Sequence, residues 1–380
     1  MNKGKGSTEQ QRWVLQFCHG YEAPFLDCAR QYAALFVDSP YKICTVFLTG
    51  TPSAEVEKES ASNEVVFLNY SSREIRGLKL KAIRDFGNIV ASHNFEFCIA
   101  HRFKPIYIAL LGSTLPILGV QHAFGVYTRG SRRFFVNRFQ HRLTLLGVSD
   151  AVRDDIRADL PNWPPGRIET LYNRIDLAVL QSRQLSREEA RQALGLSPDA
   201  LIIGNVGRLH PDKDQATLIR GFSAALSQLP PSSELAIMGS GPLEKELKDL
   251  AAQCGVSTRV KFLGKIPEGR RYFKAFDIFA LTSDHEPFGM VLLEAMAAGV
   301  PVICSNCGGG REVVEDAGLL VQLGSAEDFA CALQRMCTMS AQETDKLRHK
   351  ALERLKSCFS DQAAKARFWS LPCLPNRMTH

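Results

Sequence analysis

Short apolar runs alternate with amphipathic segments along the whole chain. In the first half, apolar or alternating runs predict β-strands, and helical spacing follows them in segments such as residues 24–36. This alternation predicts a parallel α/β sheet. The predicted strands of this half cover residues 13–17, 41–48, 65–68, 97–100, 116–121, 143–148 and 167–171.

A polar helical stretch separates this half from a second one with the same rhythm. We therefore predict a first domain over residues 1–176, a connector over 177–200 and a second domain over 201–358. A last segment, 359–380, contains a predicted helix at 361–370. The predicted strands of the second domain cover residues 201–206, 234–238, 260–263, 278–281 and 302–304.

The composition is that of a soluble globular protein. The chain has 380 residues, enough for two domains, with 45% hydrophobic and 23% charged residues. The longest apolar candidate for a membrane span, 106–120, is broken by Gly112, Pro116 and Gly119. The polar start MNKGKGSTEQQRW lacks the apolar core of a signal peptide, and the 11 cysteines have no repeating spacing. We therefore expect a cytoplasmic protein.

The net charge of +6 is modest for this length, so it does not indicate a nucleic-acid partner. The segment 129–142, RGSRRFFVNRFQHR, combines arginines with phenylalanines and contains no acid. Such a segment suits contact with an anionic membrane face or a phosphorylated acceptor. It equally suits a solvated helix whose phenylalanines face the core, and both interpretations stay open.

Several polar residues follow the predicted strands of the first domain. Ligands of parallel sheets bind beyond the carboxyl ends of the strands, where His19 and Gly20 lie. His101 and His122 follow two later strands in the same way. Two histidines at successive strand ends are more informative than one, and we treat His122 as the stronger candidate.

The stretch 283–302, SDHEPFGMVLLEAMAAGVPV, is the most informative part of the chain. Glu286 lies in a turn, Gly289 opens a helix-forming run, and Glu294 falls among apolar residues of that run. A carboxylate, then a helix N-terminus with free N–H groups, then a second carboxylate suit a ligand with an anionic end and several hydroxyls. A nucleotide sugar is such a ligand.

A second cluster of charge follows the strand at 201–206. Arg208 and Lys213 bracket a strand-to-helix turn, an arrangement suited to a departing diphosphate. Asp212, Lys213 and Asp214 formally make a metal-binding DxD, but we expect Asp212 to be the N-cap of the next helix and Asp214 a first-turn acid. The two cations would then do the work of a metal.

The string EPFGMVLLEAMAAGVPVI resembles the E-x7-E signature of retaining GT-B glycosyltransferases, in the large fourth sequence family that includes bacterial lipopolysaccharide-core enzymes. The loop after residue 206 is similar to the family's GRLxxxK element, and 239–242 to its GxGP turn. The resemblance implies two Rossmann-like domains facing a cleft, with the last helix crossing back to the first. The second domain would bind the donor and the first the acceptor.

The resemblance also implies roles for individual residues. Glu294 would hold the donor ribose, Glu286 would lie beside the transferred sugar, and Arg208 and Lys213 would stabilise the leaving diphosphate. His122 would lie near the donor sugar and phosphate. The remaining donor contacts would come from Gly20, Gly239, main-chain atoms at Ile266, and the N–H groups of Phe288, Gly289 and Met290.

The sequence thus predicts a transferase that moves a hexose, with retention, from a UDP-linked sugar to a cell-envelope glycan or glycolipid such as the lipopolysaccharide core. The nucleotide sugar is the co-substrate, and no cofactor or obligatory metal is expected. Peripheral contact with the inner membrane is compatible with the segment 129–142. Two alternatives remain, a GT-B epimerase of nucleotide sugars and a non-catalytic protein that binds them.

Overall fold

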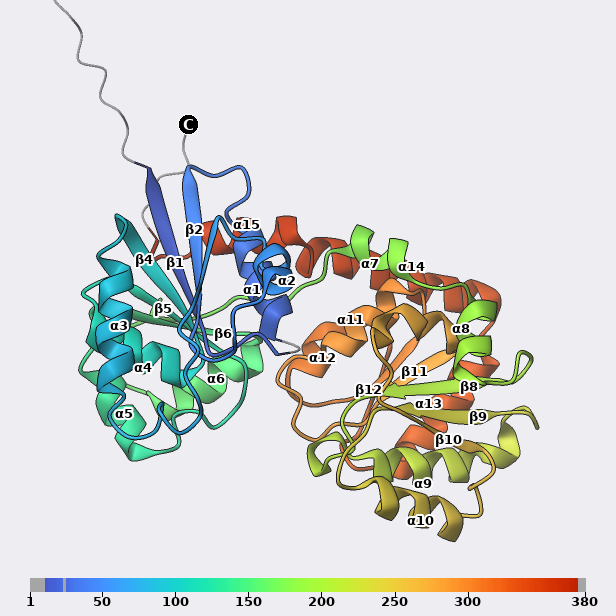
Figure 1. The fold of residues 1–380 in the computed structure, drawn as a ribbon. Helices are drawn as coiled ribbons and strands as arrows, with labels where there is room; N and C mark the ends of the chain where they lie inside the picture. Colours follow the sequence, from blue (N-terminus) through green and yellow to red (C-terminus); the bar gives the residue numbers. More distant parts are fainter. Residues whose placement is uncertain (1–10, 23–24, 375–380) are drawn as a thin grey trace, which may run out of the picture. The chain divides into compact units, whose positions relative to one another are not determined.

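The computed structural model describes residues 11–22 and 25–374. The polar start of the chain, the first residue of the helix predicted at 24–36 and the end of the tail lie outside the described residues. The chain forms two compact units (Figure 1). The first unit contains Met1–Val148, Val152–Leu171 and Lys365–His380, and the second contains Ser149–Ala151 and Tyr172–Ala364.

The first unit is built on a parallel sheet of seven strands in the order β3-β2-β1-β4-β5-β6-β7. The central strands are buried on both faces, which explains their nearly continuous apolar sequences. The strands are β1 (Arg12–Cys18), β2 (Tyr41–Phe47), β3 (Glu64–Phe67), β4 (Phe95–His101), β5 (Ile117–Gln121), β6 (Leu143–Gly147) and β7 (Ile168–Thr170).

Helices connect these strands, as parallel pairing requires. Figure 1 shows α3, α4 and α5 on one side of the sheet and α1 and α2 on the other. The helices are α1 (Phe25–Ala34), α2 (Ala54–Glu59), α3 (Leu80–Val90), α4 (Phe103–Gly112), α5 (Gly130–Asn137) and α6 (Asp150–Asp159).

The second unit has its own parallel sheet of six strands in the order β10-β9-β8-β11-β12-β13. Its core places Leu218 and Phe222 of α9 and Phe329 of α13 against Ile203 and Ile237 of the sheet. The strands are β8 (Ile202–Val206), β9 (Glu234–Met238), β10 (Val260–Gly264), β11 (Ile278–Leu281), β12 (Val302–Ser305) and β13 (Leu319–Val321).

The segment predicted as a connector is helical and counts with the second unit. Its helices are α7 (Leu177–Arg183) and α8 (Arg187–Leu194). The other helices of this unit are η1 (Pro211–Lys213), α9 (Gln215–Ala225), η2 (Leu226–Gln228), α10 (Glu244–Gln253), η3 (Gly269–Ala275), α11 (Met290–Ala297), α12 (Gly308–Val314), α13 (Ala326–Thr338) and α14 (Ala341–Cys358).

The last helix, α15 (Asp361–Trp369), returns the chain to the first unit, which includes everything from Lys365 onward. The rings of Phe368 and Trp369 pack against Phe36, at 5.6 and 5.7 Å between centroids. The predicted α/β architecture with two Rossmann-like domains and a returning last helix is therefore confirmed. Within residues 11–22 and 25–374, no helix combines the length and apolarity that crossing a bilayer requires.

Both sheets contain a switch point at which the order of strands reverses. In the first unit β1 pairs with β2 on one side and β4 on the other, and in the second β8 pairs with β9 and β11. Loops that leave such neighbouring strands diverge to opposite faces of the sheet, and ligands bind in the crevice between them. Ligand-binding sites are therefore expected at two places, the loops after β1 and β4 and the loops after β8 and β11.

Candidate functional site

The loops after β8 and β11 meet in an ion pair. Lys213 Nζ lies 2.7 Å from Glu286 Oε2, and the two side chains are only 17% and 10% exposed. Lys213 ends the 3₁₀ turn η1, and Glu286 lies in the turn that precedes α11. The fold thus brings a partly buried lysine and a carboxylate together from distant parts of the chain. They form a polar site between two loops at the switch point.

Asp212 extends this pair into a small network. Its Oδ2 lies 3.8 Å from Lys213 Nζ and 3.4 Å from Arg208 Nη2, and its Oδ1 contacts His210. The Arg208 side chain is 70% exposed, so it is able to turn toward an anion in front of the loop. The structure therefore brings Arg208 and Lys213 together around one carboxylate.

The start of α9 differs from our prediction. Asp214, not Asp212, is the N-cap, and its carboxylate accepts a hydrogen bond of 3.2 Å from the N–H of Thr217. The 3₁₀ turn over Pro211–Lys213 occupies the residues expected to open the helix, and Asp214 has a φ of 42°. Asp212 is consequently a loop residue that faces the two cations.

The turn that carries Glu286 depends on glycine. Gly289 has a φ of 95°, and a Cβ there would lie 2.8 Å from Leu292 Cδ1. As the N-cap of α11 it also leaves the first turn of the helix without a side-chain cap. Phe288 anchors the turn because it is 3% exposed and its ring packs against Tyr172 and Phe359. The N–H groups near Gly289 and Met290 are thus held on a rigid support.

A second glycine holds the same turn from behind. Gly309, in the first turn of α12, donates its N–H to the Glu286 carbonyl at 2.8 Å. A Cβ on Gly309 would lie 2.3 Å from the Pro287 carbonyl oxygen. Glycine at position 309 is therefore needed for close packing, and our sequence-based interpretation did not assign the glycine run 308–310 this part in the site.

Glu294 lies on α11 with its side chain 13% exposed. Its Oε1 is 3.8 Å from Arg270 Nε, so its cationic neighbour comes from η3 and differs from that of Glu286. The sequence pattern did not single out Arg270, since nothing in the local string RRYFK marks one arginine as facing α11.

Gly239 and Ile266 belong to the loops that follow β9 and β10. Gly239 has a φ of 146°, and its Cβ would lie 1.8 Å from the Gly207 carbonyl oxygen. Its N–H donates to the Gly264 carbonyl at 2.8 Å, which ties the two loops together. Packing alone thus explains the glycine at 239. Ile266 follows as a half-buried residue at the same edge of the sheet.

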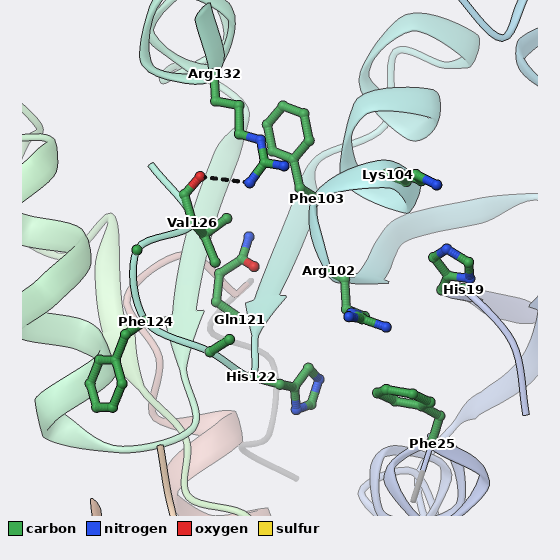
Figure 2. A pocket seen from close by; sticks show the side chains of 12 residues that line it. His19, Phe25, Arg102, Phe103, Lys104, Gln121, His122, Phe124, Val126 and Arg132 are labelled. Atoms are coloured by element: carbon green, nitrogen blue, oxygen red, sulfur yellow. Dashed lines mark hydrogen bonds between the residues drawn. The ribbon is translucent and has the colours of Figure 1, made fainter. Parts of the chain in front are cut away.

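The first unit contains a cavity of about 440 Å³ at its own switch point (Figure 2). Predicted residue His122 lines it, and so does His19, next to predicted residue Gly20. Gly20 allows close packing of this loop, since a Cβ there would lie 2.7 Å from Thr49 Oγ1. The other residues that line the cavity are Phe25, Arg102, Phe103, Lys104, Gln121, Ala123, Phe124, Gly125, Val126 and Arg132.

The histidines of this region are held neutral. His101 Nδ1 lies 3.2 Å from His122 Nε2, so the two strand ends are joined as expected for neighbouring strands. Burial and then Arg102 lower the pKa of His122 to about 4, and burial and then His122 lower the pKa of His101 well below its usual value. Burial, Lys104 and Arg102 lower the pKa of His19. Neutral imidazoles here are able to donate or accept hydrogen bonds.

No group of three histidine, cysteine, aspartate or glutamate side chains suited to a metal ion occurs in the part of the chain that the structure describes. The positive charge available to an anionic ligand comes from arginine and lysine. In the second unit these are Arg208 and Lys213, and in the first unit they are Arg102, Lys104 and Arg132.

Comparison with known proteins gives a family match for the second unit. Residues 186–354 match the family described as glycosyl transferases group 1. An uncharacterized glycosyltransferase of Methanocaldococcus jannaschii is 33% identical over 199 residues, which is 50% of each chain. The lipopolysaccharide core biosynthesis glycosyltransferase LpsE of Rhizobium meliloti is 34% identical over 175 residues, which is 46% of this chain and 50% of LpsE. The chain thus spans about half the length of the curated relatives it matches.

Solved structures extend the likeness to the fold of both units. Anabaena HepE, solved in complex with UDP and glucose, is 20% identical and has a TM-score of 0.74. The likeness covers 94% of this chain and 98% of HepE. The architecture is therefore the GT-B fold.

Proposed function

We propose that this chain is a glycosyltransferase that moves a hexose from a UDP-linked sugar to a cell-envelope glycan such as the lipopolysaccharide core, with retention of anomeric configuration. The contact of 2.7 Å between Lys213 and Glu286 carries the proposal, because it joins the two loops of the switch point at which an anionic sugar donor would bind. The match of residues 186–354 to the group 1 glycosyl transferases supports it.

Lys213 and Arg208 would hold the diphosphate of the donor. Lys213 is fixed by its buried carboxylate partner, whereas the exposed Arg208 is free to close over the ligand. Negative charge grows on the diphosphate as the glycosidic bond breaks, and two cations beside it stabilise this charge more than they stabilise the ground state. The two residues would therefore favour departure of UDP.

Glu286 would bind the transferred sugar. A carboxylate accepts hydrogen bonds from sugar hydroxyls and offsets the positive charge that develops at the anomeric carbon. Its main chain is held by Gly309 and its turn by Phe288, so the carboxylate has a fixed position. The N–H groups of Phe288, Gly289 and Met290 would add donors to the sugar or the phosphate.

Glu294 would bind the ribose of the nucleotide, since a carboxylate accepts two hydrogen bonds from a vicinal diol. Arg270 places a positive charge beside this carboxylate, with its Nε 3.8 Å from Glu294 Oε1. Main-chain atoms at Ile266 would receive the base. Gly239 would contribute by allowing the loop of Arg208 to pack closely beside it.

The first unit would bind the acceptor in its cavity, while His122, which lines this cavity, and Gly20 beside it would contact the sugar and the diphosphate of the donor. We also propose that the protein works in the cytoplasm in peripheral contact with the inner membrane. Phe134 on α5 is 73% exposed and is followed in the chain by Arg138 and preceded by Arg133, whose side chain is 43% exposed, a combination suited to an anionic lipid surface. The relationship to LpsE supports an envelope acceptor.

The test is to incubate the protein with UDP-glucose, UDP-galactose, UDP-N-acetylglucosamine and GDP-mannose, with and without purified lipopolysaccharide core, and to measure release of the nucleoside diphosphate. We expect release from one UDP-sugar that depends on the acceptor. Conversion of the donor to its epimer without acceptor would identify an epimerase instead. Donor binding without turnover for every acceptor tried would favour a non-catalytic role, and failure to bind any donor would overturn the proposal.

A further inference from the structure

The cavity of the first unit is strongly cationic. Arg102, Lys104 and Arg132 line it together with His19 and His122, and none of the described residues that line it is acidic. We propose that this cavity binds a phosphate monoester, so that the acceptor is a phosphorylated sugar or a phosphorylated lipid. The inference rests on the proposed function and adds the chemical class of the acceptor.

Aromatic rings, not carboxylates, hold the two arginines in place. The Arg102 guanidinium lies 4.8 Å from the centroid of Phe25, and that of Arg132 lies 4.7 Å from Phe103 (Figure 2). Arg132 Nη1 also donates to the Val126 carbonyl at 2.9 Å. Across residues 11–22 and 25–374, none of the ion pairs joins Arg102, Lys104 or Arg132 to a carboxylate. Their charges are therefore available to a ligand.

The cations of the cavity act on the basic groups around them. Lys104 and Arg102 both lower the pKa of His19, after burial, and Lys104 lowers the pKa of Lys79, also after burial. The carboxylate of Asp155 contacts the main chain of the lining, where its Oδ2 accepts the N–H of Gly125 at 2.9 Å, and in the described chain it forms no ion pair with Arg102, Lys104 or Arg132. A cavity with uncompensated positive charge raises the local concentration of anions and favours one that carries two charges.

Arg102 has a strained backbone conformation, which an arginine adopts only at a cost in conformational energy. Its φ is 71° and its ψ is 165°, a conformation that is essentially confined to glycine. Its N–H donates to the Val120 carbonyl at 2.8 Å, which fixes the residue at the junction of β4 and β5. Glycine would relieve the strain, so an arginine here indicates that the guanidinium is needed in the cavity.

The size and lining of the cavity suit a sugar phosphate. A volume of about 440 Å³ is within the usual range for small-molecule sites. Phe25 and Phe103 add apolar surface to the lining beside the guanidinium groups that they hold, while the cations take the phosphate. The cations assigned to the donor, Arg208 and Lys213, belong to the second unit.

The test measures binding of glucose 6-phosphate and of glucose by calorimetry at constant ionic strength, and binding to vesicles of phosphatidylcholine with and without phosphatidic acid. We expect glucose 6-phosphate to bind at least tenfold more tightly than glucose if the acceptor is soluble. If the acceptor is a lipid, we expect binding to the vesicles only when phosphatidic acid is present. Absence of binding in both arms overturns the inference.

Variants assign the binding to this cavity. Lys104→Gln and Arg132→Gln should each weaken binding of the phosphate ligand about tenfold, whereas Lys58→Gln and Arg76→Gln, exposed cations of the same unit, should leave it unchanged. Arg102→Gly should abolish binding and raise the melting temperature, because it removes both the guanidinium and the strain. Loss of stability with binding retained would contradict the inference.

Affinity for UDP separates this inference from the proposed function. If the cavity variants weaken UDP as much as glucose 6-phosphate, the cations serve the donor and the inference is wrong. If the unmodified protein binds glucose 6-phosphate through these residues but neither binds nor hydrolyses any nucleotide sugar, the phosphate site in the cavity stands, whereas the proposed transferase function fails and with it the role of this site in binding an acceptor.

Discussion

Lys213 Nζ and Glu286 Oε2 lie 2.7 Å apart, in side chains that are more than four-fifths buried and 73 positions apart in the chain. A partly buried ion pair contributes little stability by itself, because desolvation offsets much of the attraction. Its value lies in fixing two opposite charges at one place. Under the proposed function, a donor with an anionic diphosphate and a neutral, hydroxyl-rich sugar would use both charges.

Replacement of Lys213 by alanine should remove donor binding and lower stability together. The substitution leaves Glu286 with its carboxylate 10% exposed and without its cation, a loss of about 1–3 kcal/mol in the free energy of unfolding. Affinity for UDP, measured by calorimetry, should fall at least tenfold. The double variant Lys213→Met, Glu286→Gln should recover most of the stability but not the affinity. Recovery of both would remove the pair from the site.

The parts of the fold that could be predicted are those in which the local pattern of apolar residues follows directly from burial. The run 278–281 is the strand β11 because a strand buried on both faces is apolar throughout. Helix α4 was not predicted, since FKPIYIALLG has no polar face and therefore no helical period to detect. Its residues were interpreted instead as part of an interrupted apolar run.

In the candidate site, too, some residues could be predicted from local sequence and others could not. Glu286, Glu294, Arg208 and Lys213 could be chosen from motif spacing, but their partners depend on tertiary contacts. Nothing local indicates that Arg270 approaches Glu294. The conformation of Arg102 was equally hidden, because β-strand ends that are followed by helices occur with many backbone angles and only the packed structure selects one.

Gly309→Ala should weaken donor binding without touching a charged residue. The new Cβ would meet the Pro287 carbonyl oxygen at 2.3 Å and displace the turn of Glu286. We expect a loss of about 1–3 kcal/mol in stability and a fall in kcat/KM of about tenfold or more. Gly130→Ala is a matched control, because Gly130 also opens a helix and has only Arg133 Nη2 within 4 Å of such a Cβ, at 4.0 Å. Equal effects of the two substitutions would argue against a special constraint at Gly309.

The stability of the first unit should decrease in mild acid. His122 has a pKa of about 4 in the folded chain and near 6.5 when unfolded, so between these values the unfolded state binds more protons. The free energy of unfolding should therefore be highest above about pH 6.5 and fall by about 3 kcal/mol toward pH 4. All three tryptophans, Trp13, Trp163 and Trp369, belong to the first unit, so their fluorescence during urea unfolding reports on it.

His122→Asn should flatten this pH dependence, with a residual slope of the same sign from His101, whose pKa is also lowered. His349→Gln, a substitution at an exposed position of the second unit, provides the comparison. If the profiles of His122→Asn and the unmodified protein coincide, His122 does not titrate with the folding of this unit.

Glu294→Gln tests the assignment of the ribose subsite with a change in the ligand as well as in the protein. An amide oxygen accepts hydrogen bonds from a diol less strongly than a carboxylate, so affinity for UDP should fall about tenfold. The 2′-deoxy analogue of UDP lacks one of the two hydroxyls. Glu294→Gln should therefore lower the affinity for this analogue by about threefold or less. Calorimetry of both ligands with both proteins gives the coupling between Glu294 and the 2′-hydroxyl. Arg270→Gln removes the cation 3.8 Å from Glu294, and it should also weaken binding of UDP more than binding of 2′-deoxy-UDP, but by a smaller factor than Glu294→Gln. If Glu294→Gln weakens binding of UDP and 2′-deoxy-UDP equally, Glu294 does not contact the ribose.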